Sequence, residues 1–97
     1  MSQDALTRYA RGQDCQIRLS VCNGNSETVV PCHFRLGGIS GIGFKPPSFM
    51  IAFGCSSCHA VVDSITDDAT QLAFAQAVFR TQVLLHKAGL IRLGRNG

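Results

Sequence analysis

The stretch AFGCSSCHAVVD, residues 52–63, holds two cysteines and a histidine in the arrangement Cys55-x2-Cys58-His59. This arrangement is typical of three kinds of site: a c-type haem attachment site, a dithiol redox pair, or one half of a zinc site. Each interpretation implies a different class of protein, and features elsewhere in the sequence distinguish between the three.

The chain is short and contains many cysteines. Its 97 residues make one small domain, residues 1–97, and domains of this size often depend on a metal, disulfides or a partner for stability. There are five cysteines, so disulfides alone would leave one thiol unpaired. The formal net charge of +3 is too small to indicate any class of partner by itself.

The first residues, MSQDALTRYARGQDC, are polar and mixed in charge, without the apolar region of a signal peptide. No stretch approaches the roughly eighteen apolar residues of a membrane span. We therefore expect a cytoplasmic protein with reduced cysteines and no contact with a membrane. This expectation disfavours haem, which is normally attached after export. The chain is also too short and irregular for the βαβ setting of a redox dithiol.

A second pair of cysteines supports the zinc interpretation. Cys15 and Cys22 are separated by six residues, an unusually long spacing, and a long stretch of chain separates them from Cys55 and Cys58. Two such pairs can close on one tetrahedral Zn²⁺, which predicts a structural zinc site; unrelated reduced cysteines are the alternative. The fifth cysteine, Cys32, is favoured as a small buried hydrophobe over a ligand in a second site.

Two strands are expected before the second cysteine pair. The β-branched segment 28–36 predicts a strand that Pro31 restricts to a sheet edge or a bulge. A loop rich in glycine and proline follows over residues 37–48. The short apolar segment 49–54 predicts the second strand.

The remaining segments favour helices. Residues 1–12 are expected to form a short helix or a loose arm, and a helix should begin at Cys55–Ser57. A C-terminal helix is expected over about 68–88, with Asp67 or Asp68 as its N-cap and Gly89 beyond its basic last turn. Its apolar residues fall at helical spacing and predict a packing helix. They form two sets: Leu72, Ala75, Phe79 and Val83, and Phe74, Val78 and Leu85.

Three further side chains could carry chemistry. His59 and Asp63 lie four residues apart, so they share one face of the expected helix, a spacing that suits two ligands of one metal ion. Cys58 and His59 point about 100° apart around that helix. Cys58 can therefore face the zinc while His59 faces the loop that carries His33.

At these residues the chain resembles known nucleases. PCHFR, the glycine-rich loop and CSSCHAVVD together resemble the ββα-metal fold of HNH nucleases, braced by a four-cysteine zinc site. The segments ARGQDCQIRLSVCNGN, HFRLGGISGIGFKPPS, CSSCH and RTQV also resemble the prophage YbcO nuclease family over residues 10–92. A more distant relative of that family is the phage recombination-enhancement nuclease Ref.

The resemblance implies a fold and an activity. It implies an α+β fold, a small zinc-stapled HNH-like domain with its core at 11–66 and a C-terminal packing helix. The implied activity is a metal-dependent endonuclease that hydrolyses phosphodiester bonds in DNA. His33 would be the general base, and His59 would bind the catalytic divalent cation, Mg²⁺ or Mn²⁺. Asp63 would be a further ligand of that cation.

The resemblance also implies contacts with DNA. Arg35, Lys45 and Arg80 are candidates for holding the DNA backbone. The relation to Ref leaves open a recombination protein as a further partner.

The chain departs from the HNH pattern at two positions. The middle Asn is missing, and Ser48 is its nearest polar substitute. Cys32 precedes His33, where Asp or His is common, and a thiolate suits zinc better than magnesium. The alternative is a noncatalytic zinc-stabilised module that binds DNA or acts as an adaptor. It keeps the four cysteines but gives His33 and Asp63 no role.

Overall fold

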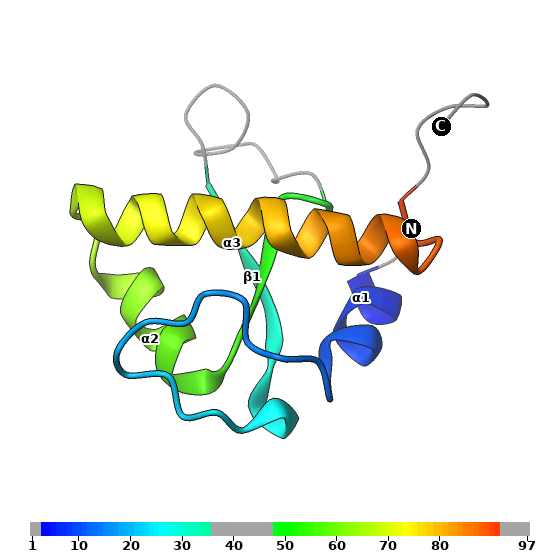
Figure 1. Ribbon diagram of the computed structural model, residues 1–97, viewed down its shortest axis with the longest axis horizontal. Helices are drawn as coiled ribbons and strands as arrows, with labels where there is room; N and C mark the ends of the chain where they lie inside the picture. Colours follow the sequence, from blue (N-terminus) through cyan, green and yellow to red (C-terminus); the bar gives the residue numbers. More distant parts are fainter. Residues whose placement is uncertain (1–2, 36–47, 92–97) are drawn as a thin grey trace.

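Two short strands form an antiparallel hairpin, β1 (Val30–His33) paired with β2 (Ile51–Gly54) (Figure 1). Phe34 N–H donates to the Met50 carbonyl at 2.9 Å. Because hydrogen-bonded pairs alternate along an antiparallel ladder, the N and C=O of Pro31 point away from β2. Proline therefore costs the ladder no hydrogen bond, as expected for an edge strand.

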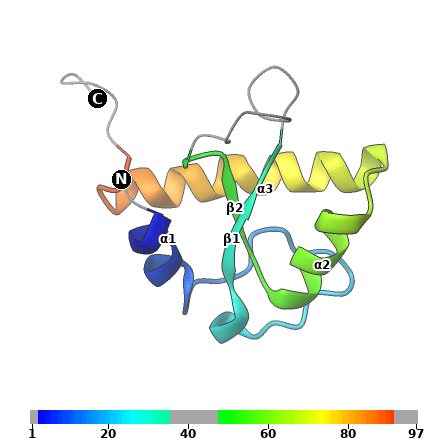
Figure 2. The ribbon, with the colours of Figure 1, turned by 180° about the vertical axis from the view of Figure 1, so that it is seen from behind.

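Three helices surround this hairpin in the computed structural model, which describes residues 3–35 and 48–91. The α3 helix crosses the strands, and α1 and α2 lie on either side of them (Figures 1 and 2). Their bounds, with a short 3₁₀ turn, are α1 Gln3–Ala10, η1 Ser26–Thr28, α2 Ser56–Ser64 and α3 Asp68–Lys87. The α+β class expected from the sequence is confirmed.

Side chains cap the two helices that follow the hairpin. Cys55 precedes α2, and its sulfur accepts a hydrogen bond from the Cys58 N–H. Asp67, rather than Asp68, precedes α3 and accepts a hydrogen bond from the Thr70 N–H at 2.8 Å. Gly89 follows α3 with a φ of 77°, the left-handed conformation that glycine adopts most readily after a helix. Within the described residues, no helix is long and apolar enough to span a membrane.

The core lies between β2, α1 and the inner face of α3. Ile51, Phe53, Leu6 and Leu85 are fully buried there. Of the two apolar sets expected to pack α3, only the one with Phe74, Val78 and Leu85 is buried. Three residues of the other set are exposed because α3 packs mainly on β2 and so buries one side. These exposed residues are Leu72, Phe79 and Val83.

Phe53 links the hairpin to its neighbours through backbone groups that point away from β1. Its N–H donates to the Thr81 hydroxyl of α3 at 3.0 Å, and its carbonyl accepts from the Gln16 N–H at 2.7 Å. The Thr81 hydroxyl in turn donates to the Ala77 carbonyl at 2.7 Å. A fully buried hydroxyl therefore fixes the position of α3 on the sheet.

Replacing Thr81 with valine should destabilise the protein by about 1–3 kcal/mol, because the Phe53 N–H would lose its acceptor in a buried position. Chemical denaturation measures this loss, and amide hydrogen exchange should show faster exchange at Phe53. Thr81→Ser is the matched control, since it keeps the hydroxyl and should leave the exchange of the Phe53 amide slow. Unchanged exchange in Thr81→Val would contradict this role of the hydroxyl.

Candidate active site

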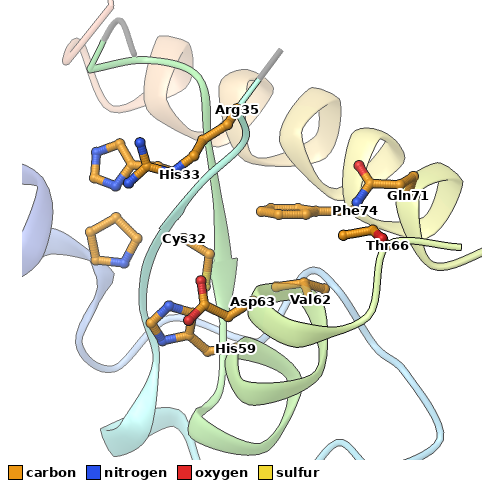
Figure 3. Close-up of a pocket in the computed structure, with 10 residues that line it drawn as sticks. Cys32, His33, Arg35, His59, Val62, Asp63, Thr66, Gln71 and Phe74 are labelled. Carbon is orange, nitrogen blue, oxygen red and sulfur yellow. The ribbon is translucent and has the colours of Figure 1, made fainter. Parts of the chain in front are cut away.

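A pocket of about 320 Å³ opens between β1, α2 and the start of α3 (Figure 3). His33 and Arg35 reach it from β1 and the residues after it, and His59 and Asp63 reach it from α2. The rest of its lining is Pro31, Cys32, Val62, Thr66, Gln71 and Phe74. The pocket thus brings together three groups that can move protons or bind metal and one guanidinium.

His59 enters the pocket because of the way α2 begins. Cys58 is fully buried and turns toward the other cysteines, while His59 is half-buried and lines the pocket. Asp63, one turn later on α2, is exposed and lines the same pocket. The imidazole and the carboxylate therefore extend from one side of α2, the arrangement expected from their spacing (Figure 3).

The electrostatic surroundings favour the neutral form of His33. Burial lowers the pKa of this half-buried imidazole, and electrostatic interaction with Arg35 and His59 lowers it further. At neutral pH the side chain is then mostly unprotonated. A neutral imidazole can accept a proton.

Some predicted residues lie elsewhere, and some residues of the pocket were missed. Lys45 falls outside the described residues. Ser48 is half-buried and is not among the residues that line the pocket. Thr66 and Gln71 do line it, although the sequence pattern predicts no role for them. No motif marks them; the turn from α2 into α3 brings them to the pocket.

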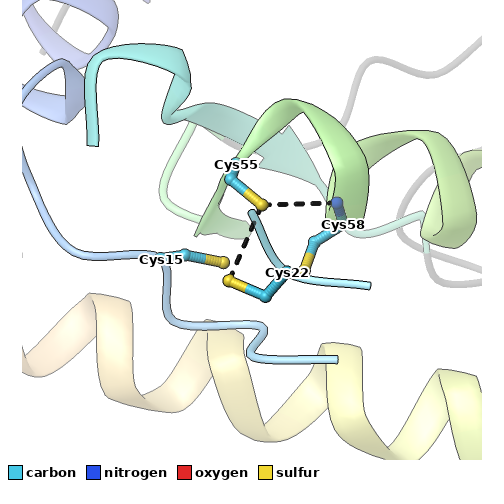
Figure 4. Close-up of side chains that lie close together, drawn as sticks. All are labelled: Cys15, Cys22, Cys55 and Cys58. Carbon is cyan, nitrogen blue, oxygen red and sulfur yellow. Dashed lines mark hydrogen bonds between the residues drawn. The ribbon is translucent and has the colours of Figure 1, made fainter. Parts of the chain in front are cut away.

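Beside the pocket, the four paired cysteines come together (Figure 4). The first pair comes from the loop after α1, and the second from the start of α2. All four sulfurs lie within 4.8 Å of one another. Among residues 3–35 and 48–91, this is the only group of three or more His, Cys, Asp or Glu side chains so placed. The members are Cys15, Cys22, Cys55 and Cys58.

The acidities within the four-cysteine cluster are uneven. Burial raises the pKa of the Cys55 thiol, but hydrogen bonds from the backbone of Cys58 and Asn23 and from the Cys58 and Cys22 thiols outweigh burial and lower it to about 6. Burial also raises the pKa of Cys58, where the neighbouring thiols of Cys55 and Cys15 add to the increase. The Cys55 thiol therefore ionises readily, whereas ionisation of Cys58 is disfavoured. A bound divalent cation would supply the charge that lets all four ionise.

For Cys22, the backbone of Gly24 lowers the pKa, whereas burial and the thiols of Cys15 and Cys55 raise it more. The net effect is a raised pKa. The four-cysteine cluster therefore fits a metal ion that prefers thiolate ligands, such as zinc.

A turn accommodates the six residues between Cys15 and Cys22. Arg18 has a φ of 56°, and the Cys22 N–H donates to the Leu19 carbonyl at 2.9 Å. The Asn23 amide then donates to the hydroxyls of Ser56 and Ser57, at 3.0 and 3.3 Å. These bonds hold the first pair against the start of α2, so six intervening residues still bring the sulfurs together.

Arg80 lies near the first cysteine pair and is half-buried. Its guanidinium donates to the Gln16 carbonyl, the residue after Cys15. This hydrogen bond gives the side chain a structural role, holding the loop against α3. Its expected contact with DNA stays a prediction.

Cys32 lies outside the four-cysteine cluster and belongs to the core. It is 1% exposed, and its thiol donates to the Val30 carbonyl at 3.6 Å. Burial raises its pKa to about 12, with the charges of Cys15 and Cys55 adding to the increase. A Cβ at Gly54 would lie 2.9 Å from its sulfur, which explains glycine at the end of β2. Cys32 is thus a small buried hydrophobe, the favoured interpretation.

Comparisons with known proteins connect this geometry to a family. The profile of the family described as "Putative nuclease YbcO" matches residues 4–90. Two relatives with that description, from Escherichia coli K12 and Enterobacteria phage 82, are each 42% identical over 92 residues, covering 90% of this chain and 96% of theirs. A solved structure described as "a putative bacteriophage protein" from Escherichia coli K-12 MG1655 is 36% identical, with a TM-score of 0.70. It covers 86% of this chain, and the match spans 98% of that protein.

Proposed function

The chain belongs to the YbcO family, and from this we propose that it is a metal-dependent DNA endonuclease of the HNH type. The observation that carries the proposal is the single pocket shared by His33, His59 and Asp63. The order of β1, β2 and α2 along the chain agrees with a ββα-metal unit. A protein that only binds DNA would have no use for these three groups in one pocket.

In the proposed mechanism His33 is the general base. Because its pKa is lowered, the imidazole is mostly unprotonated at neutral pH and can take a proton from the water that attacks a phosphodiester. The half-buried ring lines the pocket, where a bound phosphodiester would lie. Thr66 and Gln71, on the other side of the pocket, are polar groups that can orient the substrate.

His59 and Asp63 would hold the catalytic divalent cation. From one side of α2 they would supply the cation with an imidazole nitrogen and a carboxylate oxygen. When bound, the cation stabilises negative charge on the scissile phosphate and the leaving oxygen. Cys32 is not a proposed ligand, because its thiol is buried and its raised pKa keeps it protonated.

The four-cysteine cluster would hold a structural Zn²⁺. Its two pairs come from separate segments, so the ion would join the loop after α1 to the start of α2. Because His59 directly follows Cys58, this bond would also fix the position of the catalytic histidine. Reduced cysteines persist in the cytosol, whereas oxidising compartments favour disulfides, so we propose that the protein acts in the cytoplasm.

Arg35 is proposed to bind the DNA backbone next to the pocket, with Lys45 as a second contact. Arg35→Ala should weaken binding to all sequences alike, and it should reduce the slope of log K against log salt by about one unit. Titrations of a catalytically inactive background at several salt concentrations measure both effects. Arg11→Ala removes another exposed charge, outside the pocket, and should leave the slope unchanged. An effect limited to one sequence would argue for base recognition instead.

The direct test of the activity is the cleavage of supercoiled plasmid by zinc-loaded protein with Mg²⁺, with Mn²⁺, or with neither. We expect nicked circles only when one of these cations is added. DNA binding without cleavage in every condition would favour the noncatalytic zinc-stabilised module. A recombination protein that presents the DNA stays a predicted partner, and its addition is a further arm of the assay.

A further inference from the structure

One face of α3 is apolar yet open to solvent. Leu72, Phe79 and Val83 are 60%, 66% and 54% exposed. At about 100° per residue, these three side chains fall within about 40° of one another around the helix. They lie opposite the buried side that carries Thr81 and Phe74. Single exposed apolar residues are ordinary, but a stripe along one helix indicates a contact surface.

An apolar groove adjoins the C-terminal half of this stripe. It has a volume of about 780 Å³, and Phe79 and Val83 form part of its lining. Phe49, 40% exposed, lines it from the segment before β2. The Gln82 amide donates to the Phe49 carbonyl at 2.9 Å and holds that segment beside α3. The groove is therefore built from two elements and can receive a side chain from outside.

Opposite charges mark the two ends of the same helix. Asp68 begins α3, whereas His86 and Lys87 end it, and all three are exposed. If two copies of α3 lie antiparallel with their midpoints together, Asp68 lies opposite Lys87 at both ends. The same alignment sets Leu72 opposite Val83, next to the groove. The surface thus complements itself in charge and in apolar contacts, and antiparallel helix dipoles add to the attraction.

We propose that this face of α3 is a self-association surface, on which a second copy of the chain binds with two-fold symmetry. Phe79 lies near the symmetry axis, opposite Gln76 of the second copy. A parallel arrangement would set Asp68 against Asp68 and Lys87 against Lys87, which like charges disfavour. The proposal is independent of the nuclease chemistry, because Gln71 and Phe74 meet the pocket on other sides of the helix.

Sedimentation equilibrium of the full, zinc-loaded chain over roughly 5 to 500 µM tests the proposal. We expect a mass that rises with concentration toward twice the 10.4 kDa of one chain. Phe79→Glu should raise the dimer dissociation constant at least about 30-fold, because it sets two charges at the centre of the interface. Ile65→Glu changes another exposed apolar residue, outside α3, and should leave the constant unchanged.

A charge exchange then tests the alignment. Asp68→Lys and Lys87→Glu should each weaken self-association, since each sets like charges opposite one another twice. Mixing these two variants should restore dimers, because the mixed pair again has opposite charges at both ends. A wild-type chain that stays monomeric, or a dimer that Phe79→Glu leaves intact, would overturn the proposal. Single charge variants that dimerise as well as the wild type would exclude the antiparallel alignment.

Discussion

Cys22→Ser should release the zinc and unfold the domain. Three thiolates leave the site open, and structural zinc contributes on the order of 10 kcal/mol to the folding of small modules. A 97-residue domain has a total stability of only about 5–15 kcal/mol. The loss of the fourth ligand therefore removes most of what keeps the chain folded. Metal analysis and circular dichroism of the purified variant measure both consequences.

The wild-type protein is the reference for this experiment and should contain about one tightly bound zinc per chain, as one tetrahedral site requires. Cys32→Ala is the matched control, because Cys32 is equally a cysteine but lies outside the four-cysteine cluster. It should keep the zinc and lose only about 1 kcal/mol of stability. Protein without zinc, or a Cys32 variant as damaged as Cys22→Ser, would refute the ligand assignment.

His33→Ala should lower the rate of plasmid cleavage by about a hundredfold to ten-thousandfold, the usual contribution of a positioned general base. Folding and zinc content should be preserved, since His33 lies outside the four-cysteine cluster and is only half-buried. Single-turnover cleavage measures the rate, and circular dichroism with metal analysis provides the control. Wild-type activity in this variant would end the proposed mechanism and favour the binding module.

A metal titration separates the base from the cation ligands. His59→Ala and Asp63→Ala should weaken binding of the catalytic cation, so their residual activity should rise as Mg²⁺ or Mn²⁺ is added. His33→Ala should not respond, because more cation does not replace a missing base. A His33 variant rescued by added metal would make His33 a ligand instead.

Some features of this protein could be predicted because they depend on local geometry. The four paired cysteines cluster as predicted: Cys55 and Cys58 lie at the start of one helix, and hydrogen bonds from Asn23 hold the first pair against that helix. The 100° turn between neighbouring helical residues sends Cys58 to the four-cysteine cluster and His59 to the pocket. Asp67 caps α3 through its own side chain, a contact that needs only three residues of chain.

Other features could not be predicted, because they depend on which surfaces meet. Periodicity gave α3 two apolar stripes, and only its packing on β2 decided that Leu72, Phe79 and Val83 stay exposed. The same packing brings Arg80 to the Gln16 carbonyl and Gln71 to the pocket. The sequence by itself determined which four cysteines come together and that a helix follows Asp67 or Asp68, since spacing along one chain sets both. The tertiary structure decided which face of α3 is buried, because a helix that packs mainly on one strand buries mainly the side that meets it.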